Sequence, residues 1–127
     1  MVWQVIITHD GKYVLASNRG EDSIVVYRVL YPSGHLALAS THPAGGSFPR
    51  GMALVPGTYT LMVEGQSTGN LAVFSLSMEG VLAFTGQNVT GLPTPTAIAF
   101  APSGSDSLHK VDPRVLDSNH MMSQVRI

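Results

Sequence analysis

The chain has 127 residues, of which 44% are hydrophobic and 12% charged, and its formal net charge is −1. This composition is globular, and its near-neutral charge gives no electrostatic basis for binding nucleic acid or an anionic membrane surface. The chain has no cysteine, which excludes disulfide bonds and thiolate metal sites. The apolar run at its start is too short for a signal peptide or a membrane span.

The first part of the chain predicts four β-strands separated by turns. Its apolar runs are rich in β-branched and aromatic residues, or alternate apolar and polar side chains, and no apolar stripe has helical period and length. Gly11 and the pair Pro32 and Gly34 supply the backbone geometry of turns. The predicted strands are residues 3–8, 13–17, 23–29 and 35–41.

The next part of the chain repeats this pattern at an interval of 46 residues. Tyr13 is matched by Tyr59, and one inserted residue then moves the interval to 47, so that Ile24 is matched by Leu71. Four strands in each repeat of this length are typical of β-propeller blades. The predicted strands of the second repeat are residues 51–55, 59–64, 70–76 and 82–89.

The sequence therefore predicts an all-β fold, a fragment of a β-propeller. Two four-stranded antiparallel blades are expected at residues 1–49 and 50–95, followed by the opening strand of a third at 96–101. Residues 102–127 show no strand or helix pattern and are expected to form an irregular C-terminal tail. Because fewer than four blades cannot close a ring, the chain is expected to be part of a longer protein and to self-associate through exposed blade edges.

Strand order predicts which loops share one end of the blades. In an antiparallel blade, the loop between the second and third strands lies at the same end as the connection to the next blade. That end carries Arg19, Arg50 and Glu64, and loops on a rigid scaffold are where binding groups are commonly found. Its four loops are residues 18–22, 45–50, 64–68 and 91–95.

Four stretches resemble a known family. They are H-D-G-K-Y-V-L-A-S-N-R-G-E-D-S-I-V-V-Y-R-V at residues 9–29, G-G-S-F-P-R-G-M-A-L-V-P at 45–56, L-A-V-F-S-L at 71–76 and T-G-Q-N-V-T-G-L-P-T-P-T-A-I-A-F at 85–100. At this spacing they resemble the C-terminal blades of the lactonase family of seven-bladed propellers, which includes propeller-type 6-phosphogluconolactonases and carboxy-muconate cyclases. Seven blades of this length need about 320 residues, so the chain supplies about two and a half.

The resemblance implies an activity as well as a fold. It implies a cytoplasmic carboxylic ester hydrolase that needs no cofactor and acts on a small anionic sugar lactone, with 6-phosphogluconolactone as the leading substrate, or on a muconate-like anion. Because most of the propeller is missing, we expect this chain alone to be inactive.

Arg19 and Arg50 are the predicted catalytic residues. A guanidinium is always charged and presents a planar set of donors to a carboxylate or phosphate. Opening a lactone ring develops negative charge on oxygen, which donors of this kind stabilise. The simpler alternative is that both arginines bridge the loops of neighbouring blades through salt bridges.

Asn18, Gln66 and Glu64 are the predicted substrate-binding residues at the same end. The two amides suit a sugar hydroxyl, although capping of their own loops is the simpler interpretation. Glu64 has the chemistry of a general base, but a carboxylate beside Gly65 is ordinarily solvated. At the 46-residue interval Arg19 aligns with Gly65 and Arg50 with Thr96, so the arginines break the repeat.

Other functions are less well supported by the sequence. The five histidines lack metal-binding spacings, and no nucleotide-binding or serine-nucleophile motif is present. Two alternatives to an enzyme stay open. The first is a non-catalytic propeller segment that acts as an interaction module or pseudoenzyme. The second is a truncated gene product.

Overall fold

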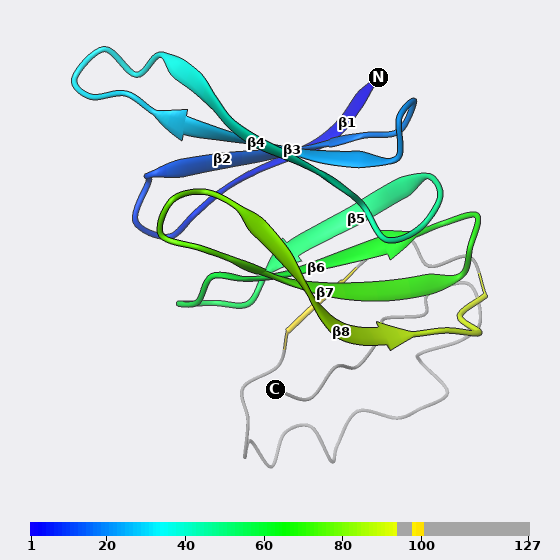
Figure 1. Ribbon diagram of the computed structural model, residues 1–127. Coiled ribbons are helices and arrows are strands. Elements are labelled where there is room, and N and C mark those ends of the chain that lie inside the picture. The colour runs from blue at the N-terminus through cyan, green and yellow to red at the C-terminus, as the bar shows by residue number, and fades with distance from the viewer. Residues whose placement is uncertain (94–97, 101–127) are drawn as a thin grey trace.

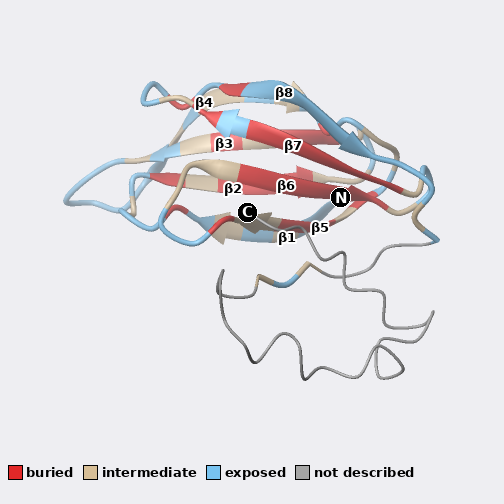
Figure 2. Cartoon of the chain, turned by 90° about the horizontal axis from the view of Figure 1, so that it is seen from below, coloured by how far each residue is buried: buried red, intermediate tan, exposed pale blue. Residues whose placement is uncertain are grey.

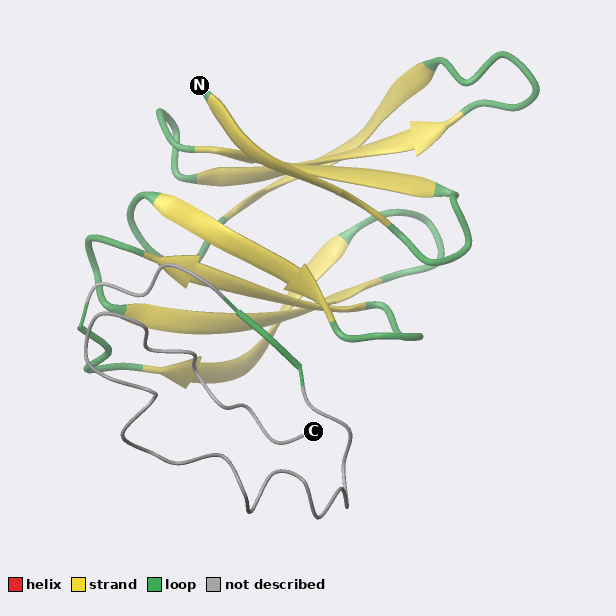
Figure 3. Ribbon diagram, turned by 180° about the vertical axis from the view of Figure 1, so that it is seen from behind, coloured by secondary structure: helices red, strands yellow, loops and turns green. Residues whose placement is uncertain are grey.

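The computed structural model describes residues 1–93 and 98–100, and it arranges them as two stacked antiparallel sheets of four strands each (Figure 1). No helix occurs in this part of the chain (Figure 3), so none could cross a membrane, and the predicted all-β class is confirmed. The strands of the first sheet, in spatial order, are β1 (Val2–Ile7), β2 (Tyr13–Asn18), β3 (Ser23–Val29) and β4 (Leu36–Pro43). Those of the second are β5 (Pro49–Leu54), β6 (Thr60–Gly65), β7 (Asn70–Leu76) and β8 (Leu82–Val89).

Each sheet has the meander order of a propeller blade, and we call them blade 1 and blade 2. All eight predicted strands are present, and each begins and ends within two residues of its predicted limits. Turn chemistry and the alternation of side chains fixed these limits, because both act over a few residues.

The main core lies between the two blades. Strands β2, β6 and β7 are the most deeply buried (Figure 2). Leu15 and Val26 of blade 1 pack with Leu61 and Phe74 of blade 2 in one cluster, and all four are almost fully buried. Burying such side chains contributes roughly 1.5–3 kcal/mol each, so each blade depends on the other for much of its stability.

The side-chain amide of Gln4 joins β1 of blade 1 to β5 of blade 2. The Gln4 side chain donates from Nε2 to the Met52 carbonyl at 2.8 Å, and its Oε1 accepts the Met52 N–H at 2.7 Å. A carboxamide carries a donor and an acceptor side by side, so it satisfies both main-chain groups of one residue on β5. We call this pair of bonds the Gln4 clamp.

Main-chain hydrogen bonds show that equivalent residues in the first three strands of the two blades are 47 residues apart, which corrects the alignment predicted from the sequence. The Arg19 N–H donates to the Met1 carbonyl and the Gln66 N–H to the Phe48 carbonyl, a shift of 47 for both partners. Equivalent bonds, Val29 to Lys12 and Leu76 to Tyr59, shift by 47 again. The equivalence of Tyr13 with Tyr59 was therefore wrong. A glycine with positive φ occurs at neighbouring, non-equivalent places in the two turns, at residues 11 and 57, which explains the error.

The interval returns to 46 at the turn between the third and fourth strands. Leu30 N–H bonds to the His35 carbonyl in blade 1, whereas Ser77 N–H bonds to Val81 in blade 2, so the second turn is one residue shorter. With the corrected register, Arg19 corresponds to Gln66 instead of Gly65, and Trp3 corresponds to Arg50.

The two outer faces of the stack differ. On blade 2, Leu92, Ile98 and Phe100 pack over a buried apolar cluster that includes Met62 and Leu71. The predicted third-blade strand lies at 96–101, of which only 98–100 are described, and these three residues are not in a strand. The predicted tail, 102–127, lies outside the described residues.

On blade 1, the outer face is apolar and open. Register places Ile7, Val14, Tyr27 and Leu38 in one row across the four strands. Ile7 is 58% exposed and Leu38 66% exposed. The row that corresponds to it in blade 2 (Leu54, Leu61, Phe74 and Phe84) lies on the face that packs against blade 1. The open row therefore has the form of a surface that receives another blade.

We predict that the chain self-associates through this open row, because an exposed apolar face of this extent favours association. Leu38→Lys should shift the population toward the monomer in light scattering across a concentration series. Met78→Lys is the matched control, since Met78 is 67% exposed in the turn between β7 and β8, away from the row. A wild-type chain that stays monomeric at high concentration would contradict the prediction.

Candidate functional site

Three of the four predicted loops gather at one end of the two blades, and the fourth, 91–95, lies partly outside the described residues. The loop after β2 contacts the connection between β4 and β5, because Asp22 Oδ1 accepts the Phe48 N–H at 2.8 Å. That connection contacts the loop after β6, where Thr68 Oγ1 accepts the Ser47 N–H at 3.1 Å. Three chain segments far apart in sequence thus form one rigid end, which carries Arg19.

Arg19 lies over two aromatic rings. Its Cζ lies 4.6 Å from the centroid of the Trp3 ring and 5.0 Å from that of Phe48. Its Nη2 donates to Gln66 Oε1 at 3.5 Å, a long bond, and its buried Nε has no hydrogen-bond partner in the part of the chain that the structure describes. Stacking on aromatic faces orients the guanidinium without neutralising its charge.

Phe48 reaches this position through an unusual backbone. Its φ is +55°, a conformation that costs about 1–3 kcal/mol for a bulky residue and is found where surrounding contacts enforce it. Two contacts do so. The Asp22 carboxylate accepts a hydrogen bond from the Phe48 N–H, and the Phe48 carbonyl accepts one from the Gln66 N–H at 3.1 Å. Asp22 and Gln66 therefore place the ring over Arg19.

Arg50 lies close to the same tryptophan. Its Cζ is 5.6 Å from the Trp3 ring centroid, so one indole lies near both predicted catalytic arginines. Arg50 comes from β5 at an irregularity in its pairing with β6, between Pro49 and Met52. A bulge of this kind re-aims a side chain at a strand end.

Asn18 caps its own loop, the simpler of the two interpretations given above. Its Oδ1 accepts the N–H of Gly20 at 3.1 Å and the terminal amino group of Met1 at 3.2 Å. The side chain thus caps its own loop and ties down the start of β1. The structure brings Gln66 to Arg19 but gives Asn18 a local role.

Glu64 differs from what the sequence suggested. The expectation of a solvated carboxylate was wrong, because Glu64 is fully buried and neither of its oxygens has a hydrogen-bond partner among the described residues. Burial raises its pKa from the ordinary 4.5 to about 7, against the opposing effect of the Arg50 charge. Its carboxyl lies directly over Gly51, where a Cβ would collide with it.

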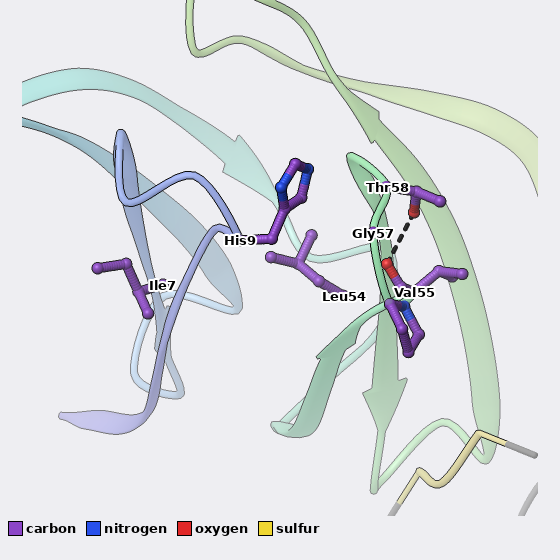
Figure 4. A pocket seen from close by; sticks show the side chains of 7 residues that line it. Ile7, His9, Leu54, Val55, Gly57 and Thr58 are labelled. Carbon is purple, nitrogen blue, oxygen red and sulfur yellow. Dashed lines mark hydrogen bonds between the residues drawn. The ribbon is translucent and has the colours of Figure 1, made fainter.

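A pocket of about 180 Å³ lies at the opposite end of the blades (Figure 4). It is formed by the first turn of each blade, and Thr58 Oγ1 donates across one of these turns to the Val55 carbonyl at 2.9 Å. Its lining residues are Ile7, His9, Leu54, Val55, Pro56, Gly57 and Thr58. Within the described ranges no group of histidine, cysteine or acidic residues could hold a metal ion.

Comparison with known proteins decides the family. A family model described as "Lactonase, 7-bladed beta-propeller" matches residues 4–100. The chain belongs to this lactonase family. Among its relatives is the 6-phosphogluconolactonase of Bacillus subtilis, which is 35% identical over 95 residues, or 74% of this chain and 27% of the relative. The 6-phosphogluconolactonase of Formosa agariphila is 39% identical over 75 residues, or 58% of this chain and 21% of the relative.

Solved structures described as lactonases share this fold. The periplasmic gluconolactonase of Pseudomonas aeruginosa matches with a TM-score of 0.70 at 26% identity, over 75% of this chain and 26% of its own. A putative 6-phosphogluconolactonase of Bacteroides uniformis matches with a TM-score of 0.69 at 28% identity, over 74% and 27%. The chain thus spans about a quarter of the length of these relatives.

Sequence reasoning missed the residues that hold Arg19 in place. Trp3 lies outside the stretches that carry the family resemblance, and Asp22 and Phe48 lie inside them but were given no role. The corrected register was the available signal, because it makes Trp3 the counterpart of Arg50 and so places it at the same end of the neighbouring inner strand.

We predict that the buried Glu64 makes stability fall as pH rises. The folded pKa of about 7 exceeds the ordinary 4.5, so the folded state retains the proton that the unfolded state loses. The free energy of unfolding should therefore fall between about pH 4.5 and 7, by roughly 3 kcal/mol in total, and level off above that range.

Urea denaturation at pH 5 and pH 8 measures this effect. Glu64→Gln should be similar to the wild type at pH 5 and more stable than it at pH 8, because an amide cannot ionise. Equal pH dependence in the two proteins would show that Glu64 ionises normally in the folded chain.

Proposed function

We propose that Arg19 and Arg50 form the anion-binding part of a lactonase site in a complete propeller that contains these two blades. The observation that carries this proposal is the Arg19 guanidinium, which lies over two aromatic rings that do not neutralise its charge and whose buried Nε has no hydrogen-bond partner among the described residues. A fixed cation of this kind is pre-organised for an anion, because the protein has already met the cost of holding it.

The chemistry follows from what two guanidiniums can do. In hydrolysis, a water oxygen attacks the lactone carbonyl carbon, the carbonyl oxygen becomes an oxyanion, and the ring C–O bond then breaks to give the hydroxy acid. One arginine binds the negative group of the substrate while the other stabilises the oxyanion. The proposal assigns no base in this chain for the attacking water.

A small anionic sugar lactone is the proposed substrate, and 6-phosphogluconolactone is the leading candidate. The names of the Bacillus subtilis and Formosa agariphila relatives support this choice. We place the reaction in the cytoplasm, although one similar structure is of a protein described as periplasmic. The chain alone is expected to be inactive, because it spans about a quarter of its relatives.

We predict that Arg19→Ala and Arg50→Ala each lower kcat/KM for 6-phosphogluconolactone in a complete propeller that carries these blades. For the arginine that stabilises the oxyanion the loss should be about 10²–10³. Arg28→Ala is the matched control. Arg28 is exposed near the other end of the blades, where it donates to the Glu79 carbonyl. Unchanged turnover in both test variants, with stability retained, would remove the arginines from the site.

Trp3 provides a direct test of anion binding, since it is the one tryptophan in the chain. An anion that binds the guanidiniums should change the indole emission, because both arginines lie within 6 Å of the ring. Titration of the chain with 6-phosphogluconate should give a saturable change that Arg19→Ala abolishes. Gluconate without the phosphate, at the same ionic strength, is the control ligand.

A further inference from the structure

One hydrogen bond joins two residues that have left-handed backbones. The φ angle is +51° at Asp22 and +55° at Phe48. An aspartate tolerates this conformation, whereas a bulky aromatic residue adopts it only where its surroundings enforce it. Asp22 Oδ1 accepts the Phe48 N–H at 2.8 Å. The residue that tolerates the conformation is thus bonded to the residue that does not, and the two form one arrangement.

The connection between β4 and β5 is held from both blades. From blade 1, the Asp22 carbonyl accepts the Ala44 N–H at 2.8 Å, and the Asp22 carboxylate accepts the Phe48 N–H. From blade 2, Thr68 Oγ1 accepts the Ser47 N–H at 3.1 Å. Two side chains therefore bond neighbouring main-chain groups of one connection, and Asp22 is the one that bonds the residue whose ring lies at Arg19.

Asp22 and Arg19 lie on the same loop, but in the described part of the chain their side chains bond to different partners. Arg19 Nη2 donates to Gln66 Oε1, while Asp22 Oδ1 accepts from the Phe48 main chain. A carboxylate bonded to the guanidinium would compete with a substrate anion for the same donors. The bond to Phe48 gives the Asp22 oxygen another partner, so it supports the site without occupying it.

We propose that Asp22 is a positioning residue of the anion site, which holds Phe48 in its left-handed conformation and thereby keeps an aromatic ring over Arg19. Without the carboxylate, Phe48 can relax to an ordinary φ and its ring can leave Arg19, whose Cζ lies 5.0 Å from the ring centroid. Arg19 then gains freedom that an anion must remove on binding. The effect on anion affinity rests on the proposed function, whereas the placement of Arg19 does not.

Substitutions at Asp22 separate its hydrogen bond from its charge and its backbone. Asp22→Asn keeps an oxygen acceptor and tolerates the left-handed backbone, but it carries no charge. Asp22→Gly adopts the same backbone freely and keeps the main-chain bond to Ala44, but it lacks the acceptor. Thr68→Ala is the matched control, because it removes a side-chain bond to the same connection at the neighbouring residue Ser47.

NMR of the Arg19 side chain in the complete chain measures the placement without a ligand. The face of an aromatic ring shields the groups above it, so the wild-type Arg19 Nε–H resonance should lie upfield of that of an unstacked arginine. Asp22→Gly should lose the part of this shift that comes from Phe48, and Phe48→Leu should lose the same part. Asp22→Asn and Thr68→Ala should keep the shift.

Titration with 6-phosphogluconate, followed by the emission of Trp3, measures the consequence for binding. We expect binding about tenfold weaker in Asp22→Gly, which corresponds to one hydrogen bond of ordinary strength. Asp22→Asn and Thr68→Ala should bind as the wild type does. In the Phe48→Leu background, Asp22→Gly should weaken binding no further, because two residues that act through one contact are not additive.

Two results would overturn the proposal. One is an Arg19 resonance that stays in place in Asp22→Gly, or that moves equally in Thr68→Ala, since general loosening of the connection would then explain it. The other is a further loss of affinity in the double variant, which would show that Asp22 does not act through Phe48. A wild-type chain that binds no 6-phosphogluconate would contradict the proposed function and the effect on affinity, while the Arg19 resonances would still decide whether Asp22 places the ring.

Discussion

A four-stranded blade with two apolar faces cannot bury both faces by itself, and the rest of this structure depends on that constraint. Blade 1 and blade 2 each bury one face against the other, through the cluster that joins Leu15 and Val26 to Leu61 and Phe74. Their outer faces differ in how far they are covered. Ile98 and Phe100 cover part of the outer face of blade 2, while the row from Ile7 to Leu38 stays open.

Stacking of the blades is also what assembles the site. Arg19 comes from blade 1, whereas Arg50 and Gln66 come from blade 2, so no single blade holds the constellation. Trp3 lies near both arginines, and Phe48 sits on the connection between the blades. The apolar core therefore sets the positions of the charged groups, and a weaker interface would separate the two guanidiniums.

The sequence predicted the strands and the end of the blades at which the loops gather, because turn residues and side-chain alternation act locally. It failed on the register between the repeats, since Gly11 and Gly57 are a misleading match when turn lengths differ. It also failed on Glu64. A carboxylate next to glycine suggests solvent, and nothing local reveals that Gly51 on another strand leaves room for it. The contact of Arg19 with Trp3 and Phe48 joins distant segments, which no single-sequence pattern encodes.

The shortened turn at Ser77–Val81 shows how the two ends of a blade differ in their tolerance of change. One residue is lost there relative to blade 1, yet the bonds Arg19 to Met1 and Gln66 to Phe48 at the far end keep the same geometry. Insertions and deletions at the turn end are absorbed where they occur. The loop end, in contrast, is cross-linked between segments by Asp22 and Thr68. Variation in chain length within this architecture should therefore accumulate at the end away from the arginines, and engineered insertions belong there too.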